Sequence, residues 1–245
     1  MGSTSTTDAY ALAEAKFLKG DFEGARETLD AALSVDADAG QLWELLGMVA
    51  YADSDINGAV DALERASMFV PLANCSQFVL ALGYEKQHRD EPAYTIYRHL
   101  AAQRNLDDNL LEPVARALGR FDDCQGALNV CRLAARRSPD TTEPLMGMVF
   151  YMQRLGRPTE QILPVLFQSL HLDPEDNDCR LATARALHDC SRHEEAAYLL
   201  SQMPIESCRC PSCLNSMQMI FAAACDEESL SRCLAAQQAL EEEAR

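Results

Sequence analysis

The chain has 245 residues, of which 48% are apolar and 24% charged, and this composition excludes a disordered chain, a collagen and a membrane bundle. Such a length predicts one or two ordinary domains, or one elongated repeat domain. Thirty-eight acidic against 21 basic residues give a net charge of −17, which repels phosphate backbones and argues against nucleic acid as a partner. Glycine (11) and proline (10) are scarce, so the loops should be short.

The sequence carries no run of about 18 apolar residues, so membrane insertion is not expected. Its start lacks the basic and apolar regions of a secretory signal, although Met1 to Thr6 fits the loose pattern for myristoylation of Gly2. Ten cysteines without an export signal predict a cytoplasmic protein with reduced thiols.

Several positions recur at intervals of 34 residues, among them Ala25, Ala59, Ala93 and Ala127, and Ala13, Gly47, Ala81 and Ala115. Within one period, apolar residues at helical spacing fill 42–52, a short polar turn follows, and a second apolar stripe ends near Pro71. One such hairpin cannot bury its own apolar face, so neighbouring hairpins must stack.

In chain order, this period predicts repeats at 6–39, 40–73, 74–107 and 108–141, an irregular fifth repeat, and a sixth at 177–203. In the fifth, Met146-Gly147-Met148-Val149 copies Leu46-Gly47-Met48-Val49 with a longer turn, and Pro164 should start the second helix late or kink it. The predicted segments are a flexible N-terminus (1–7), a repeat domain (8–205), a cysteine-rich loop (206–213) and a degenerate seventh hairpin with a C-terminal cap (214–245).

The pattern Trp43-x2-Leu46-Gly47…Ala59-x3-Leu63-x2-Ala66…Pro71 resembles the tetratricopeptide repeat family. The resemblance covers nearly the whole chain. It implies an all-α, right-handed superhelical solenoid of about six to seven stacked antiparallel helix pairs, and a scaffold that binds other proteins.

Enzyme signatures are missing from the sequence: there is no glycine-rich phosphate loop, no G-x-S-x-G elbow and no H-E-x-x-H. A non-catalytic protein is therefore expected. The family's heat-shock co-chaperones grip a carboxylate with Lys and Asn on first helices, but Tyr10, Glu14 and Met48 stand at those places. That particular role is not expected here.

The segment Cys208-Arg209-Cys210-Pro211-Ser212-Cys213 has the richest chemistry of the chain. Three thiols within six residues suit zinc, although no cofactor is required by the pattern. In a stacked solenoid this loop lies beside the preceding connection, so His171 or Cys179 is the candidate fourth ligand. Two alternatives stay open: a redox pair of Cys210 and Cys213, or inert cysteines.

The resemblance also implies that first helices line a concave groove for a peptide or helix of a partner protein. The candidate partner-binding residues are Tyr10, Glu14, Phe17, Glu44, Met48, Tyr51, Phe78, Leu82, Glu85, Arg116, Arg120, Tyr151 and Arg185. The N-terminal part of this set is aromatic and acidic, and the C-terminal part carries arginines. An adaptor, scaffold or chaperone-like module is the leading hypothesis; a metal-binding or redox-responsive sensor that uses the cysteine cluster is the alternative.

Overall fold

A computed structural model of the chain describes residues 6–243, and this range forms fourteen α-helices, one short 3-10 helix and no strand. The all-α fold class is confirmed. Gly2 lies outside the described residues, as do residues 1–5 of the predicted flexible N-terminus, whereas Thr6 and Thr7 already belong to the first helix. No helix within 6–243 is long and apolar enough to cross a membrane.

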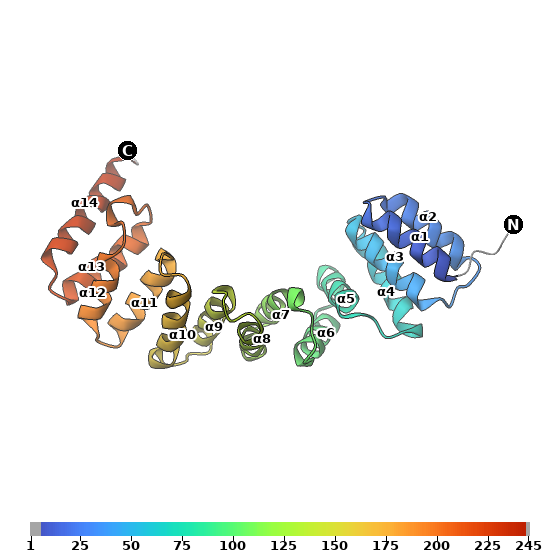
Figure 1. The fold of residues 1–245 in the computed structure, drawn as a ribbon, viewed down its shortest axis with the longest axis horizontal. Coiled ribbons are helices and arrows are strands. Elements are labelled where there is room, and N and C mark those ends of the chain that lie inside the picture. The colour runs from blue at the N-terminus through green and yellow to red at the C-terminus, as the bar shows by residue number, and fades with distance from the viewer. Residues whose placement is uncertain (1–5, 244–245) are drawn as a thin grey trace. The chain divides into compact units, whose positions relative to one another are not determined.

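The helices pair into consecutive antiparallel hairpins, as α3 with α4 and α5 with α6 illustrate (Figure 1). Their first helices begin at intervals of 34 or 35 residues, which confirms the repeat. Taken two by two in chain order, the helices are α1 (Thr6–Leu18) and α2 (Phe22–Leu33), α3 (Gly40–Ala52) and α4 (Ile56–Phe69), α5 (Asn74–Lys86) and α6 (Asp90–Ala102), α7 (Asp108–Arg120) and α8 (Cys124–Arg137), α9 (Glu143–Arg154) and α10 (Thr159–Leu172), α11 (Asn177–Asp189) and α12 (His193–Ser201), and α13 (Pro211–Ala223) and α14 (Glu227–Glu243).

The chain divides into two compact units, one that ends at Val130 and one that begins at Cys131, so α8 spans the boundary. In the first unit, Leu29, Leu63 and Tyr97 are fully buried between successive hairpins. In the second unit, Leu166 and Phe221 have the same role. Each hairpin thus buries its apolar stripe against its neighbours in the same unit, as hairpin repeats must.

A residue with positive φ lies two positions after the end of each first helix and marks the register of the repeat. These residues are Gly20, Ser54, His88, Asp122, Gly156, Ser191 and Cys225, at intervals of 34 or 35. In four hairpins the next residue is an aspartate whose carboxylate accepts the backbone N–H three residues later, at 3.0 Å for Gly24, 2.9 Å for Gly58, 2.8 Å for Gly126 and 3.0 Å for Ser229. This N-cap satisfies an otherwise unpaired donor of the second helix.

The fifth hairpin keeps this register up to Gly156, and its turn, residues 155–158, is one residue longer than the three-residue turns of the other hairpins, so the predicted longer turn is confirmed. Gly156 follows Asp122 by 34 residues, so Gly147 is not the counterpart of Gly47. A Cβ on Gly47 would lie 2.6 Å from Leu63 of its own hairpin, whereas one on Gly147 would lie 2.9 Å from Cys131 of the preceding hairpin. The two Leu/Met-Gly-Met-Val segments are therefore offset by two residues relative to the repeat.

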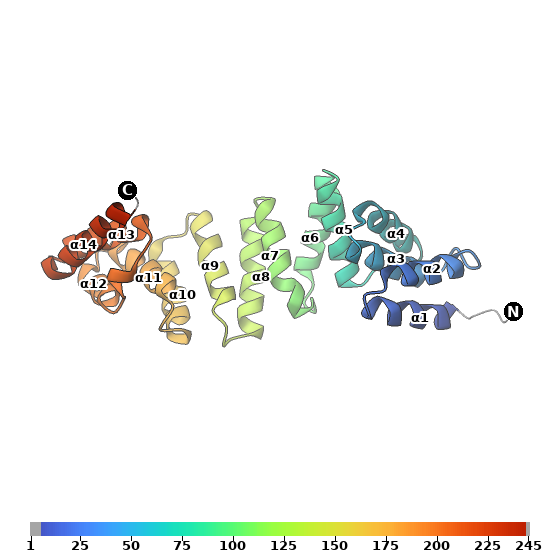
Figure 2. The same cartoon turned by 90° about the horizontal axis from the view of Figure 1, so that it is seen from above.

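Two further expectations change at the C-terminal side. Pro164 lies inside a continuous α10, so the helix does not start late. The predicted cysteine-rich loop is shorter, because Pro211 to Cys213 form the first turn of α13. The last hairpin keeps the spacing of the others, and α13 lies beside α14 (Figure 2).

Candidate functional site

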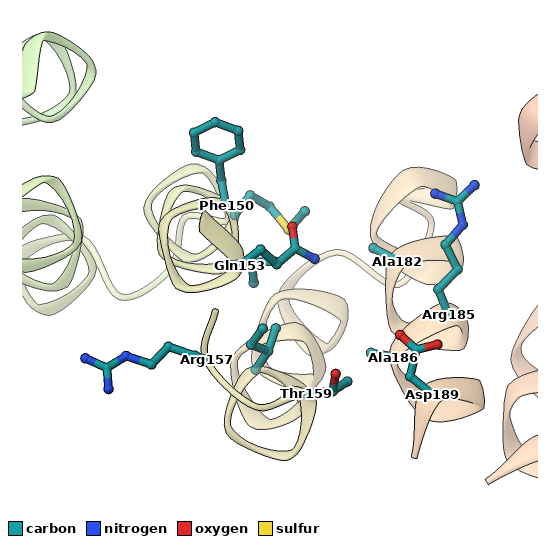
Figure 3. A pocket seen from close by; sticks show the side chains of 11 residues that line it. Phe150, Gln153, Arg157, Thr159, Ala182, Arg185, Ala186 and Asp189 are labelled. Carbon is teal, nitrogen blue, oxygen red and sulfur yellow. The ribbon is translucent and has the colours of Figure 1, made fainter. Parts of the chain in front are cut away.

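A pocket of about 520 Å³ opens between the first helices α9 and α11 in the second unit (Figure 3). Its apolar side chains include Phe150, which is 52% exposed. Gln153 reaches from α9 toward α11, where Arg185 and Asp189 stand on the facing side (Figure 3). The lining residues are Met146, Val149, Phe150, Gln153, Arg157, Thr159, Ile162, Ala182, Arg185, Ala186 and Asp189. An apolar floor with a few polar groups is typical of sites that hold peptides or small ligands.

Tyr151, the predicted α9 contact, is only 6% exposed and does not line this pocket. The prediction for Tyr151 is wrong because it relied on the Met146-Gly147 motif. This motif is offset by two residues from the repeat, so it placed Tyr151 on the wrong face of α9. Phe150 and Gln153 of α9 line the pocket instead. The interval of 34 from Asp122 to Gly156 was the sequence signal that could have found them.

A second pocket, of about 430 Å³, lies between α1, α3 and α5 in the first unit. Its lining comprises Tyr10, Gln41, Glu44, Leu45, Ala73, Cys75 and Ser76, so the structure brings together two of the predicted residues. The Glu44 carboxylate accepts the Ala73 N–H at 2.8 Å and thereby anchors the start of α5. Burial, followed by the charges of Glu14 and Glu44, raises the pKa of Tyr10 and keeps its hydroxyl protonated.

Two predicted charges, Glu85 and Arg120, pair with each other. Arg120 donates from Nε and Nη2 to the Glu85 carboxylate, each at 2.7 Å, and Tyr97 donates to the same carboxylate at 3.1 Å. The hydrogen bonds from Arg120 hold the pKa of Glu85 below its ordinary value. Burial first, and then the Glu85 charge, raise the pKa of Tyr97. The acidic and arginine halves of the predicted groove thus neutralise each other at this point.

The remaining predicted contacts vary in exposure. Arg116 is exposed and pairs with Glu112 at 2.7 Å on its own helix. Phe17 packs against the core beside Phe22, with ring centroids 6.0 Å apart. Phe78 is half-buried against Tyr97, at 5.8 Å. Glu14 is exposed, and the half-buried members are Met48, Tyr51 and Leu82.

The cysteine cluster surrounds the start of α13, but the predicted fourth ligands do not join it. Cys179 is fully buried and its thiol donates to the Leu166 carbonyl, while burial raises its pKa. His171 is exposed in the last turn of α10. No three metal-ligating side chains gather within 6–243, so these residues as arranged do not fit a zinc ion.

Comparisons with solved structures show the fold. The C-terminal part of a TPR repeat-containing protein from Cytophaga hutchinsonii superposes with a TM-score of 0.67 at 11% identity, covering 95% of each chain. YrrB, a TPR protein with an unusual peptide-binding site, gives 0.58 at 16% identity over 75% of this chain and 91% of its own. MamA gives 0.59 at 15% identity over 73% and 96%. No protein-family model and no curated protein matches the sequence.

The chain therefore has the fold of tetratricopeptide-repeat proteins. The sequence resemblance and the structural neighbours agree on stacked helix hairpins.

Proposed function

We propose that the protein is a non-catalytic interaction module that binds a peptide or helix of a partner protein along its first helices. The pocket between α9 and α11 carries this proposal, because the exposed Phe150 ring, the Gln153 amide and two residues of opposite charge, Arg185 and Asp189, all line it. In YrrB the same fold carries a peptide-binding site, which supports the assignment.

The chemistry of this pocket favours an extended segment. Gln153 can both donate to and accept from a peptide backbone, and Met146, Val149 and Phe150 offer apolar area for one side chain. Arg185 already donates to Ser216 of α13 at 2.7 Å, so its guanidinium is positioned before a partner arrives. Pre-positioning lowers the ordering cost of binding.

The test places a photo-cross-linking side chain at Gln153 and, as a matched control, at exposed Gln168 on the second helix α10. A partner should be trapped from Gln153 and not from Gln168, and the trapped segment should be unstructured or helical in isolation. Equal trapping at both positions, or trapping only at Gln168, would overturn the proposal.

The alternative hypothesis of a metal sensor stays a prediction. Zinc at Cys208, Cys210 and Cys213 would need a rearrangement that brings in another ligand. Metal analysis of the purified protein tests it: about one zinc per chain would support this alternative.

A further inference from the structure

Two thiols lie one helical turn apart at the N-terminus of α13. Cys210 is the N-cap residue, and its sulfur accepts the backbone N–H of Cys213 at 3.3 Å. The same sulfur lies 3.1 Å from the Ser212 hydroxyl. The Cys210 sulfur is therefore folded back over the backbone of the residue that carries the second thiol.

The environment makes these two thiols chemically unequal. Hydrogen bonds from Cys213, and then from Ser212, lower the pKa of Cys210 to about 7. The reciprocal hydrogen bond to Cys210 raises the pKa of Cys213. A helix N-terminus favours the anion as well. These directions agree with the N-cap position of Cys210, whose sulfur accepts a helix N–H, and we therefore assign Cys210 as the attacking thiol and Cys213 as the second.

Other cysteines of the second unit differ. Cys233 is fully buried, and burial raises the pKa of its thiol to about 11. Cys179 is enclosed between α10 and α11. Cys208 adjoins the pair, with its sulfur 3.8 Å from the Cys210 carbonyl, but it is not placed on the helix terminus. Cys210 and Cys213 are both half-exposed, and the backbone N–H of Cys213 donates to the Cys210 sulfur.

We propose that Cys210 and Cys213 form a thiol–disulfide exchange site whose oxidant is a small disulfide of the glutathione type. This site is independent of the peptide-binding function proposed above. It rests on the paired sulfur atoms at the start of α13 and on their accessibility next to exposed Pro211 and Ser212.

The exchange balances in two steps. The Cys210 thiolate attacks one sulfur of RSSR, a Cys210–SR bond forms, the RS–SR bond breaks and RS⁻ leaves. Cys213 then loses its proton and attacks the Cys210 sulfur, so that a Cys210–Cys213 bond forms and the second RS⁻ leaves. The two cysteines are oxidised by two electrons, and RSSR is reduced to two thiols that take up the two protons.

The experiment treats the reduced full chain with glutathione disulfide, quenches it by alkylation and maps the cysteines by mass spectrometry. The wild type should give the Cys210–Cys213 disulfide. Cys213→Ser should stop at a glutathione adduct on Cys210, and Cys210→Ser should give neither product. Serine is a good N-cap, so Cys210→Ser should keep the start of α13, which circular dichroism checks.

Cys75→Ser is the matched control, because Cys75 is exposed on α5 and outside the cluster. It should react as the wild type does. A disulfide between Cys208 and Cys210 would overturn the assignment of Cys213 as the second thiol. A Cys213→Ser variant that carries no adduct on Cys210, or a Cys75 that reacts as fast as Cys210, would overturn the whole site.

Discussion

Arg120 on α7 holds Glu85 on α5 through two parallel hydrogen bonds of 2.7 Å, and thereby links consecutive hairpins of the first unit. The pair is half-exposed, with 48% of the Arg120 side chain and 25% of the Glu85 side chain accessible. Bidentate geometry makes such a pair stronger than most surface ion pairs. Both residues had been predicted to contact a partner, so the same charges have a structural role in the free protein.

Glu85→Gln should lower the free energy of unfolding by about 1 kcal/mol at neutral pH. Because the pKa of Glu85 is depressed in the folded protein, this contribution is complete above its ordinary value of 4.5 and disappears as the pH falls through the lower folded value. Urea unfolding at neutral pH and at about pH 3 measures the difference. Glu112→Gln removes an exposed ion pair within α7 and should lower the free energy of unfolding by a smaller amount. An equal loss at both pH values would contradict this account.

Ser54 has φ of 66°, a conformation that side chains branched at Cβ tolerate poorly. Ser54→Val should therefore destabilise the turn between α3 and α4 by about 1–2 kcal/mol, whereas Ser54→Gly should be close to neutral. Thermal unfolding followed by circular dichroism compares the two variants. If valine were as stable as glycine at this position, the positive φ would not be a requirement of the turn.

Gly47 marks the crossing of α3 and α4, where a Cβ would lie 2.6 Å from Leu63 and 3.2 Å from the Ala59 carbonyl oxygen. Gly47→Ala should lower the free energy of unfolding by about 1–3 kcal/mol through overpacking, in spite of the better helix propensity of alanine. Chemical denaturation measures this loss. Asp61→Ala on the exposed face of α4 is the control and should be neutral. A more stable Gly47→Ala protein would show that the hairpin can open without cost.

The 34-residue period predicted the hairpins because it reflects a physical repeat, in which small residues recur where helices cross. The error at the fifth hairpin came from a local motif match, and the period itself holds there. Met146-Gly147-Met148-Val149 resembles an earlier segment, but its glycine contacts Cys131 of the preceding hairpin and not its own second helix. A four-residue match cannot distinguish these two crossings, whereas the turn at Gly156 does.

The candidate site was less predictable than the fold. The sequence places Glu85 and Arg120 on helix faces of the right kind, but a face does not reveal whether two charges 35 residues apart meet. Likewise, clustering of Cys208, Cys210 and Cys213 was visible, whereas the N-cap position of Cys210 depends on α13 starting at Pro211. Periodicity predicts where each helix lies in the repeat, but only the three-dimensional structure shows which side chains of neighbouring helices meet.

The rate at which Cys210 is alkylated should rise with pH, with a midpoint near the Cys210 pKa of about 7. The groups around the pair are Cys208, Cys213 and Arg185 of α11, and Arg185 partly offsets the raised pKa of Cys213. At neutral pH, Cys210 should react about fivefold faster than an ordinary exposed thiol, since a larger thiolate fraction outweighs the lower nucleophilicity of each thiolate. Timed iodoacetamide labelling with peptide mapping measures the midpoint of the pH profile and the relative rate at neutral pH. In Cys213→Ala the midpoint should move upward, and an unchanged midpoint would contradict the hydrogen-bond origin of the shift.

Phe150 and Tyr151 are adjacent on α9 but should respond oppositely to truncation, because Phe150 is 52% exposed beside the pocket and Tyr151 is 6% exposed. Phe150→Ala should weaken binding of the partner segment trapped at Gln153 by about 2 kcal/mol and leave the melting temperature nearly unchanged. Tyr151→Ala should instead lower the free energy of unfolding by about 3 kcal/mol through loss of buried aromatic area. Calorimetric titration and thermal unfolding of both variants separate the effects. Exposed Gln168→Ala should alter neither quantity. If Tyr151→Ala stayed stable and lost binding while Phe150→Ala bound normally, the assigned face of α9 would be wrong.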